Sequence, residues 1–131
     1  MDGELIFIRA CVKPSNRASI RGSFEIDSGG NHALFLNKPF VERHSLLAPA
    51  QRERSVLVGG IGGSSRVVMG AVENLQLGRR SVDNPSTLFS LATDGMLANG
   101  EFDGNIGNDI LRRFKIVFDY SRRFMILESN P

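Results

Sequence analysis

One short segment, FEIDSGG at residues 24–30, places a carboxylate where it could take part in acid–base chemistry. Apolar and polar residues alternate up to Asp27, as in a half-buried strand, and two glycines free the backbone just beyond it. An aspartate in this position is also a common turn former, because its side chain can bond to amides two residues further along the chain. Taken alone, the segment favours the turn.

A second segment, GGIGG at residues 59–63, could be read as a phosphate-binding loop. It lacks the Lys-Ser/Thr ending of a P-loop and the glycine spacing of a dinucleotide fingerprint, and it leads into a β-like segment instead of a helix. We therefore expect no nucleotide site. Four glycines among five residues fit either a tight turn or a hairpin tip that closes over a ligand, and the apolar Ile61 favours the hairpin tip.

Candidate metal ligands are few and poorly spaced. Asp103, Asn105 and Asp109 do not follow the spacing of an EF-hand calcium loop, and no helix is expected before them, so a turn is the better interpretation. His32 and His44 fit no metal-ligand spacing such as HExxH, and we expect a surface or packing role for both. The sequence therefore predicts neither a bound metal nor a cofactor.

Length and composition indicate one compact domain with a modest core, since 41% of the 131 residues are hydrophobic. The 16 basic and 14 acidic residues are scattered, and with no Trp and one Tyr there is little on which bases could stack. This argues against a nucleic-acid partner. Cys11 is the only cysteine, so no internal disulfide can form and we expect it in the core. No apolar run has membrane-spanning length, the first residues lack the features of a signal peptide, and nothing assigns a compartment.

Short β-like segments separated by turns dominate the chain, which predicts a mainly β, closed barrel-like domain with two short helices. Asn37 is expected to cap the first helix and Pro39 to lie in its first turn. Residues 94–107 are rich in Gly, Asn and Asp, and no strand is expected there. The expected strands are Leu5–Val12, Ile20–Ile26, Ala33–Leu36, Ser55–Val58, Arg66–Leu77 and one near Ser86–Leu91; the expected helices are Phe40–His44 and Asp109–Phe114; a C-terminal hairpin surrounds Asp119–Arg122.

Three segments, in this order, resemble the retropepsin family of aspartic proteases, the single-lobe relatives of pepsin. FEIDSGG resembles the family's apolar strand followed by DTG or DSG, and GGIGG resembles the flap tip of retroviral proteases. NIGNDIL at residues 105–111 is similar to the segment before the family's short C-terminal helix. The resemblance spans most of the chain and implies a closed acid-protease barrel with a glycine-rich flap hairpin.

Bacterial retropepsin-like domains are more similar still, because the resemblance extends over NKPFVERHSL, DGNIGNDILRRF and FDYSRRFMILE. Some such proteins resemble a tandem of two aspartic lobes followed by a PDZ domain. We therefore expect residues 1–131 to form a single retropepsin-like aspartic protease lobe, which would also suit a segment excised from a longer chain.

The resemblance implies roles for individual residues at matching positions. Asp27 is the implied catalytic residue, the Ser28 hydroxyl is expected to bond across the pair of active-site loops, and Gly29 is expected to let the turn fold tightly. Gly30 stands where the family often has Ala and Asn105 where it usually has an apolar residue, so the packing beneath the loop is in question. The remaining implied site residues are Ile106 and Gly107, packed beneath the loop, and Gly59, Gly60, Ile61, Gly62 and Gly63, closing as a flap over an extended peptide.

Aspartic-protease chemistry needs two carboxylates, because one group cannot deprotonate a water and protonate a leaving amine at the same moment. The chain offers one DSG, so the resemblance implies a second Asp27 from a homodimer, or its counterpart from a sister lobe. Aspartic proteases are the standard example of two carboxylates about 3 Å apart sharing one proton. The implied function is hydrolysis of a peptide or protein substrate by an aspartic endopeptidase without a cofactor. The alternative is a non-catalytic module of the same fold that binds peptides or pairs with another lobe.

Overall fold

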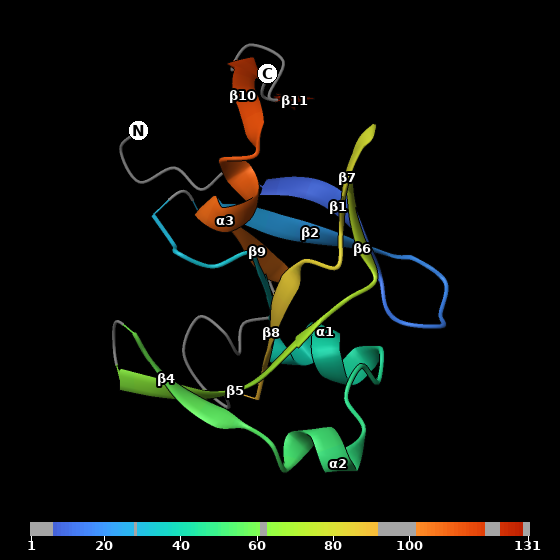
Figure 1. Ribbon diagram of the computed structural model, residues 1–131, viewed down its shortest axis with the longest axis vertical. Helices are drawn as coiled ribbons and strands as arrows, with labels where there is room; N and C mark the ends of the chain where they lie inside the picture. Colours follow the sequence, from blue (N-terminus) through green and yellow to red (C-terminus); the bar gives the residue numbers. More distant parts are fainter. Residues whose placement is uncertain (1–6, 28, 61–62, 92–101, 120–123, 130–131) are drawn as a thin grey trace.

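The computed structural model describes residues 7–27, 29–60, 63–91, 102–119 and 124–129, and most of these residues lie in strands (Figure 1). The mainly β fold expected from the sequence is confirmed. The elements are β1 (Phe7–Lys13), β2 (Ile20–Asp27), β3 (Leu34–Leu36), α1 (Lys38–Arg43), α2 (Pro49–Arg52), β4 (Val56–Gly60), β5 (Gly63–Ala71), β6 (Asn74–Leu77), β7 (Arg80–Asp83), β8 (Ser86–Ser90), β9 (Gly104–Gly107), α3 (Asn108–Leu111), β10 (Phe114–Asp119) and β11 (Phe124–Ser129).

Nine strands form one sheet in the order β4-β5-β8-β3-β9-β2-β1-β6-β7, and β10 and β11 form a separate antiparallel pair. The end strands β4 and β7 each pair with one neighbour only, so the described strands do not close a barrel by hydrogen bonding. The expectation of a closed barrel was wrong in this respect. The physical reason is that the two ends of the sheet are hairpins, β4–β5 and β6–β7, which lie on opposite sides of the molecule (Figure 1).

The N-terminal hairpin is confirmed, with β1 and β2 antiparallel from Phe7 opposite Glu25 to Val12 opposite Ile20. Alternate residues of the pair enter the core, because successive side chains of a strand point to opposite faces. Val12 and Phe24 are fully buried. Cys11 was expected in the core, but it lies on the opposite face of β1 from Val12 and is half-buried. The hairpin therefore presents an apolar face from which β2 runs to Asp27.

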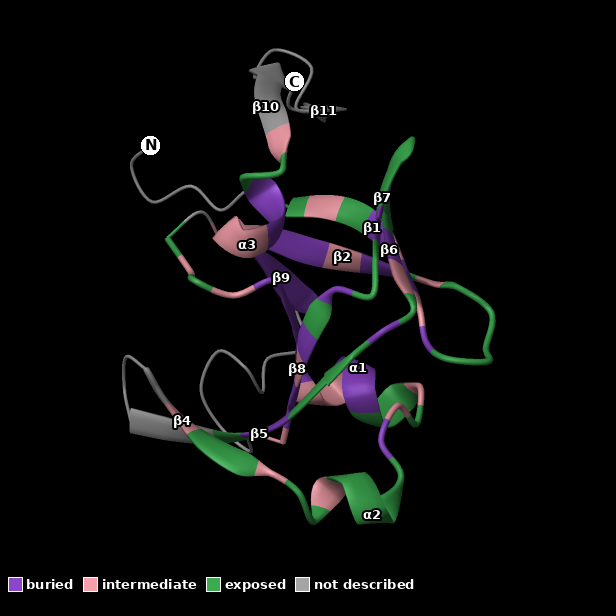
Figure 2. Cartoon of the chain, viewed as in Figure 1, coloured by how far each residue is buried: buried purple, intermediate pink, exposed green. Residues whose placement is uncertain are grey.

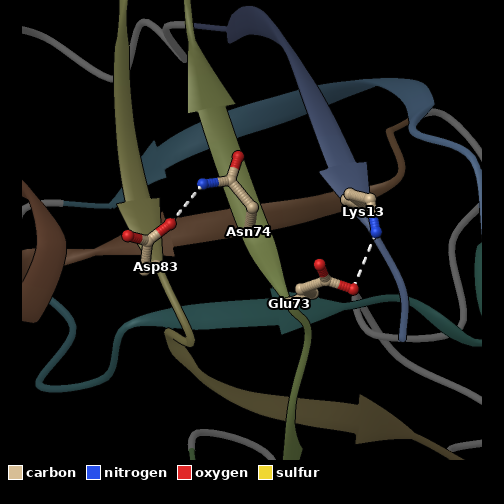
Figure 3. A network of polar contacts seen from close by, with 4 residues as sticks. All are labelled: Lys13, Glu73, Asn74 and Asp83. Carbon is tan, nitrogen blue, oxygen red and sulfur yellow. Dashed lines mark hydrogen bonds and ion pairs between the residues drawn. The ribbon is translucent and has the colours of Figure 1, made fainter. Parts of the chain in front are cut away.

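The single strand expected over residues 66–77 is two strands in the structure, β5 and β6. The chain leaves the first ladder after Ala71 and joins a second one, where the Glu73 amide donates to the Lys13 carbonyl (2.8 Å) and β6 pairs with β1. Figure 3 shows the polar contacts at this junction: Lys13 Nζ lies 2.7 Å from Glu73 Oε2, and Asn74 Nδ2 donates to Asp83 Oδ1 at 2.8 Å. The sequence reasoning missed the break because both halves have the same β-like composition.

Strand β9 lies where no strand was expected. Its sequence, GNIG, has little intrinsic preference for a strand, yet all four residues are buried between β2 and β3. It pairs parallel with β2 and antiparallel with β3. A Cβ on Gly104 would lie 2.0 Å from the Phe35 carbonyl oxygen, so only glycine permits this close approach of the two strands. The turn expected over Asp103, Asn105 and Asp109 was therefore wrong.

The core is formed by apolar residues from most strands of the sheet and from α1 and α3, and Figure 2 shows buried stretches on β2, β8, β9 and both helices. Phe24 and Phe40 meet edge to face with ring centroids 6.1 Å apart. Asn37 is the N-cap residue of α1, as expected, but its side chain does not cap the helix: its Nδ2 donates to the Phe102 carbonyl at 3.1 Å. Pro39 lies in the first turn of α1, which confirms its predicted place.

The remaining elements are helices α2 and α3, strand β7 and the β10–β11 hairpin. Helix α3 overlaps the predicted helix Asp109–Phe114 but begins one residue earlier and ends at Leu111, and the C-terminal hairpin of β10 and β11 is confirmed. Helix α2 and strand β7 were not expected from the sequence. No helix in the described part of the chain is long and apolar enough to cross a membrane.

Candidate active site

Asp27 is the last residue of β2, and this end of β2 pairs with β9. Ile26 lies opposite Ile106 and Asp27 opposite Gly107 in parallel register. Ile106 is fully buried, whereas Asp27 is half-buried and its carboxylate lies at the boundary of the core. The structure therefore brings together three of the predicted site residues, Asp27, Ile106 and Gly107, from segments about 80 positions apart in the sequence.

The loop that follows Asp27 is attached to the start of α3. The Gly30 amide donates to the Asp27 carbonyl at 3.3 Å and closes a turn, and the amide of Asn108 donates to the Gly30 carbonyl at 2.9 Å. The amide of Asp109 donates to the His32 carbonyl at 3.0 Å. In Figure 1 this loop runs beside α3. Ser28 lies outside the described residues, so its predicted role as a scaffold stays a prediction.

Two of the predicted scaffold glycines differ in their surroundings. A Cβ on Gly107 would lie 2.3 Å from the carbonyl oxygen of His32, a backbone atom that cannot move aside, so glycine is required there. A Cβ on Gly29 would find only Asp27 Oδ1 within 4 Å, at 3.8 Å, an ordinary contact distance. Sterically, Gly107 is therefore the essential glycine of the pair within one chain.

His32 lies in the candidate site, although the sequence suggested an ordinary surface or packing role. Its Nε2 is hydrogen-bonded to Asn105 Oδ1, and its ring packs edge to face on Phe35 with centroids 5.8 Å apart. The point that a Cβ on Gly30 would occupy is 2.6 Å from His32 Nδ1 and 2.8 Å from Asp27 Oδ2. The imidazole and the carboxylate therefore flank the same small space. The two departures from the family pattern, Gly30 and Asn105, were the sequence signal that could have pointed to His32.

Glu25 was also missed. It precedes Asp27 by two residues on β2, so both side chains leave the same face of the strand. Glu25 is 7% exposed, and its Oε2 has no hydrogen-bond partner among the described residues. Burial raises the pKa of its carboxyl group, and the nearby negative charge of Asp27 raises it further. The candidate site thus holds a second carboxyl group that binds its proton more tightly than a free glutamate does.

The glycine-rich hairpin is formed by β4 and β5, with Gly59 opposite Ser64 and Gly60 opposite Gly63. This confirms the hairpin that the sequence predicted around GGIGG. Ile61 and Gly62, at its tip, lie outside the described residues. In the sheet, β8, β3 and β9 separate this hairpin from β2. Closure of the hairpin over a ligand stays a prediction.

Comparison with solved structures shows which known fold the chain resembles. No protein-family model and no curated protein matches the sequence. Among solved structures, the chain is similar to the crystal structure of a retropepsin-like aspartic protease from Rickettsia conorii, with a TM-score of 0.62 and 16% sequence identity over 97% of this chain and 92% of that one. The chain therefore has a retropepsin-like fold, as its sequence suggested. At this identity the likeness establishes the fold alone.

Proposed function

We propose that this chain is one lobe of an aspartic endopeptidase, with Asp27 as its catalytic residue. The observation that favours this function most is the position of Asp27 in a retropepsin-like fold, at the end of a buried strand and opposite Gly107. A carboxylate held by a rigid ladder, with a glycine-rich loop after it, can be presented to a substrate with little conformational freedom. The similarity of the whole chain to an aspartic protease from another organism supports the same class of chemistry.

The proposed mechanism uses two copies of Asp27, or Asp27 and its counterpart in a sister lobe. At close range the two carboxyl groups hold one proton between them, because two adjacent negative charges are costly. The ionised group takes a proton from a water molecule, which attacks the scissile carbonyl carbon. The protonated group gives its proton to the carbonyl oxygen. The group that took the proton from water then passes it to the leaving amine, while the other group regains its proton from the hydroxyl of the tetrahedral intermediate as the C–N bond breaks.

Substrate binding is assigned to the sheet and to the β4–β5 hairpin. A peptide in extended form can add to exposed strand edges through its backbone, and the glycines at 59, 60 and 63 leave room for such a backbone. Ser28, Gly29, Ile61 and Gly62 keep the scaffold and flap roles implied by the resemblance. Residues 1–131 would then act as one lobe, alone in a symmetric dimer or joined to a second lobe.

Asp27→Asn tests the catalytic assignment directly. The amide keeps the shape of the side chain but cannot accept a proton from water, so cleavage of a peptide library should fall at least about a hundredfold. Asp83→Asn is the matched control, because Asp83 lies on β7 at the far end of the sheet from β4 and is exposed. Unchanged cleavage by the Asp27→Asn protein would rule out the mechanism. No cleavage by either the wild type or the variant, together with peptide binding by both, would favour the non-catalytic module.

The source of the second carboxylate is tested by measuring mass in solution. A homodimer predicts a mass near 29 kDa, twice the 14.4 kDa of the chain, under conditions where cleavage is seen. Mixing wild-type protein with an excess of Asp27→Asn protein should then suppress activity by forming mixed dimers, since each active dimer needs both aspartates. Full activity from a monomer would contradict the shared dyad.

A further inference from the structure

The side chain of His32 occupies a slot that three other residues form. A Cβ on Gly107 would lie 2.3 Å from the His32 carbonyl oxygen and 2.9 Å from the ring carbon Cδ2, so only glycine leaves room for His32 there. A Cβ on Gly30 would lie 2.6 Å from Nδ1 and 2.5 Å from Cε1 of the His32 ring. Asn105 provides the hydrogen bond to Nε2. An alanine at either glycine would displace the ring or its backbone.

The hydrogen bond with Asn105 determines which ring nitrogen carries the proton. An amide oxygen can only accept, so Nε2 must be the donor, and Asn105 itself is 8% exposed in the buried strand β9. In the neutral ring Nδ1 is then an acceptor, and it faces the same space as Asp27 Oδ2. The ring is thus held with its free nitrogen beside the carboxylate.

The charged groups around His32 come from two elements. Asp27 and Glu25 lie on β2, and the pKa of Glu25 is raised by burial and by the charge of Asp27. From α3, Asp109 donates its backbone amide to His32, and its carboxylate lies 3.2 Å from Arg112. Strands β9 and β3 contribute the neutral side chains Asn105 and Phe35. Asp27 is therefore the carboxylate placed to respond most to the charge on His32.

We propose that His32 is a positioning residue for Asp27, a second proton-binding group whose ring is fixed by Asn105 and whose Nδ1 exchanges hydrogen bonds with the Asp27 carboxyl group, directly or through one water. When the ring is neutral, Nδ1 carries no proton and donates nothing to the Asp27 carboxylate. When the ring gains a proton at Nδ1, the new N–H donates to an ionised Asp27, and the Nε2–H bond to Asn105 is kept. Only N–H and O–H bonds form or break. His32 thereby couples the hydrogen bonding of Asp27 to the protonation of its own ring.

NMR titration of the two imidazoles tests this coupling without any measurement of cleavage. The chain has only two histidines, and His44, which packs on Phe40 in α1, is the internal control. Removing a negative charge close to a ring makes its protonated form less favourable, so in Asp27→Asn protein the His32 curve should move to lower pH by at least about half a unit. The His44 curve should stay within about a tenth of a unit. Asp27→Ser provides the same comparison if the amide variant does not fold.

A His32 curve that stays in place in the folded Asp27 variants would overturn the inference, as would an equal shift of both histidines. The Nε2–H tautomer, read from the ¹⁵N shifts of the neutral ring, is a second requirement, and the opposite tautomer would also overturn it. The inference deepens the proposed function, but its test is separate. A shifted His32 curve in a protein without peptidase activity would support the coupling and reject the protease, whereas an active protease without the shift would reject the coupling alone.

Discussion

The carbonyl oxygen of His32 lies so close to Gly107 that a Cβ on Gly107 would be only 2.3 Å from it. This contact joins the loop after Asp27 to the strand that faces Asp27 in the ladder, since Gly107 is the register partner of Asp27. The amides of Gly107 and Asp109 donate to the carbonyls of Ala33 and His32 on either side, at 2.8 and 3.0 Å. The candidate site is therefore built by backbone packing as much as by side chains.

Gly107→Ala should destabilise the fold by about 2 to 3 kcal/mol, because the new methyl group overlaps backbone that is hydrogen-bonded on both sides. Urea unfolding measures the effect. Gly29→Ala is the matched control: its Cβ finds only Asp27 Oδ1, at 3.8 Å, so it should cost less than about 1 kcal/mol. Equal losses in the two variants would contradict the steric account of Gly107.

Gly30→Ala should be tolerated only when the imidazole is absent. A Cβ at residue 30 would lie 2.5 Å from the ring carbon Cε1 of His32, so the single variant must displace the ring. In a His32→Ala background the two overlaps with the ring disappear, and the next contact is with Asp27 Oδ2 at 2.8 Å, the end of a side chain that can rotate. A double-mutant cycle by thermal unfolding should give a coupling energy of about 1 kcal/mol or more. Additive effects would show that His32 does not fill this space in solution.

Glu25→Gln should raise stability at neutral pH by about 1 kcal/mol, because burial disfavours the charged carboxylate and Oε2 has no hydrogen-bond partner among the described residues. The folded-state pKa of Glu25 is raised above 4.5, so the wild-type protein binds this proton more tightly than the unfolded chain does. As pH falls through the raised pKa toward 4.5, the wild type regains stability that the Gln variant never lost. The difference between the two proteins should therefore shrink from pH 7 to pH 4.5 in urea titrations. A difference that is the same at both pH values would contradict this account.

Lys13→Met should abolish the lowering of the Glu73 pKa. The side-chain hydrogen bond from Lys13 is the main cause, its positive charge is the second, and Asp83 opposes them (Figure 3). A lowered carboxyl pKa contributes stability that is present above 4.5 and lost as pH falls through the folded-state value. Because the pair is exposed, this contribution should be small and sensitive to salt. NMR titration of Glu73 provides the measurement, and Asp83→Asn should move its pKa in the opposite direction to Lys13→Met.

The sequence predicted the parts of the fold where local pattern and tertiary structure agree. Alternation over β2, the β-branched run of β1 and the hairpin around the glycines of GGIGG all appear as expected. Strands β1 and β2 bury alternate residues in the core, and the glycines are placed to turn the chain between β4 and β5. The DSG segment and its order relative to the other two motifs pointed to the retropepsin-like fold. Local pattern failed where composition is uniform, as at the break between β5 and β6, or where short segments lack pattern, as in α2 and β7.

By itself, then, the sequence determined that Asp27 ends a strand and that a glycine-rich loop follows it, since alternation and backbone freedom are local properties. Only the tertiary structure decided what surrounds the carboxylate. GNIG becomes a strand because β2 and β3 supply hydrogen-bond partners on both sides, and that strand brings Asn105 and Gly107 to the loop. His32 fits no motif spacing in the sequence, and its ring lies next to the same space as Asp27 Oδ2 because Gly30 and Gly107 have no side chains there.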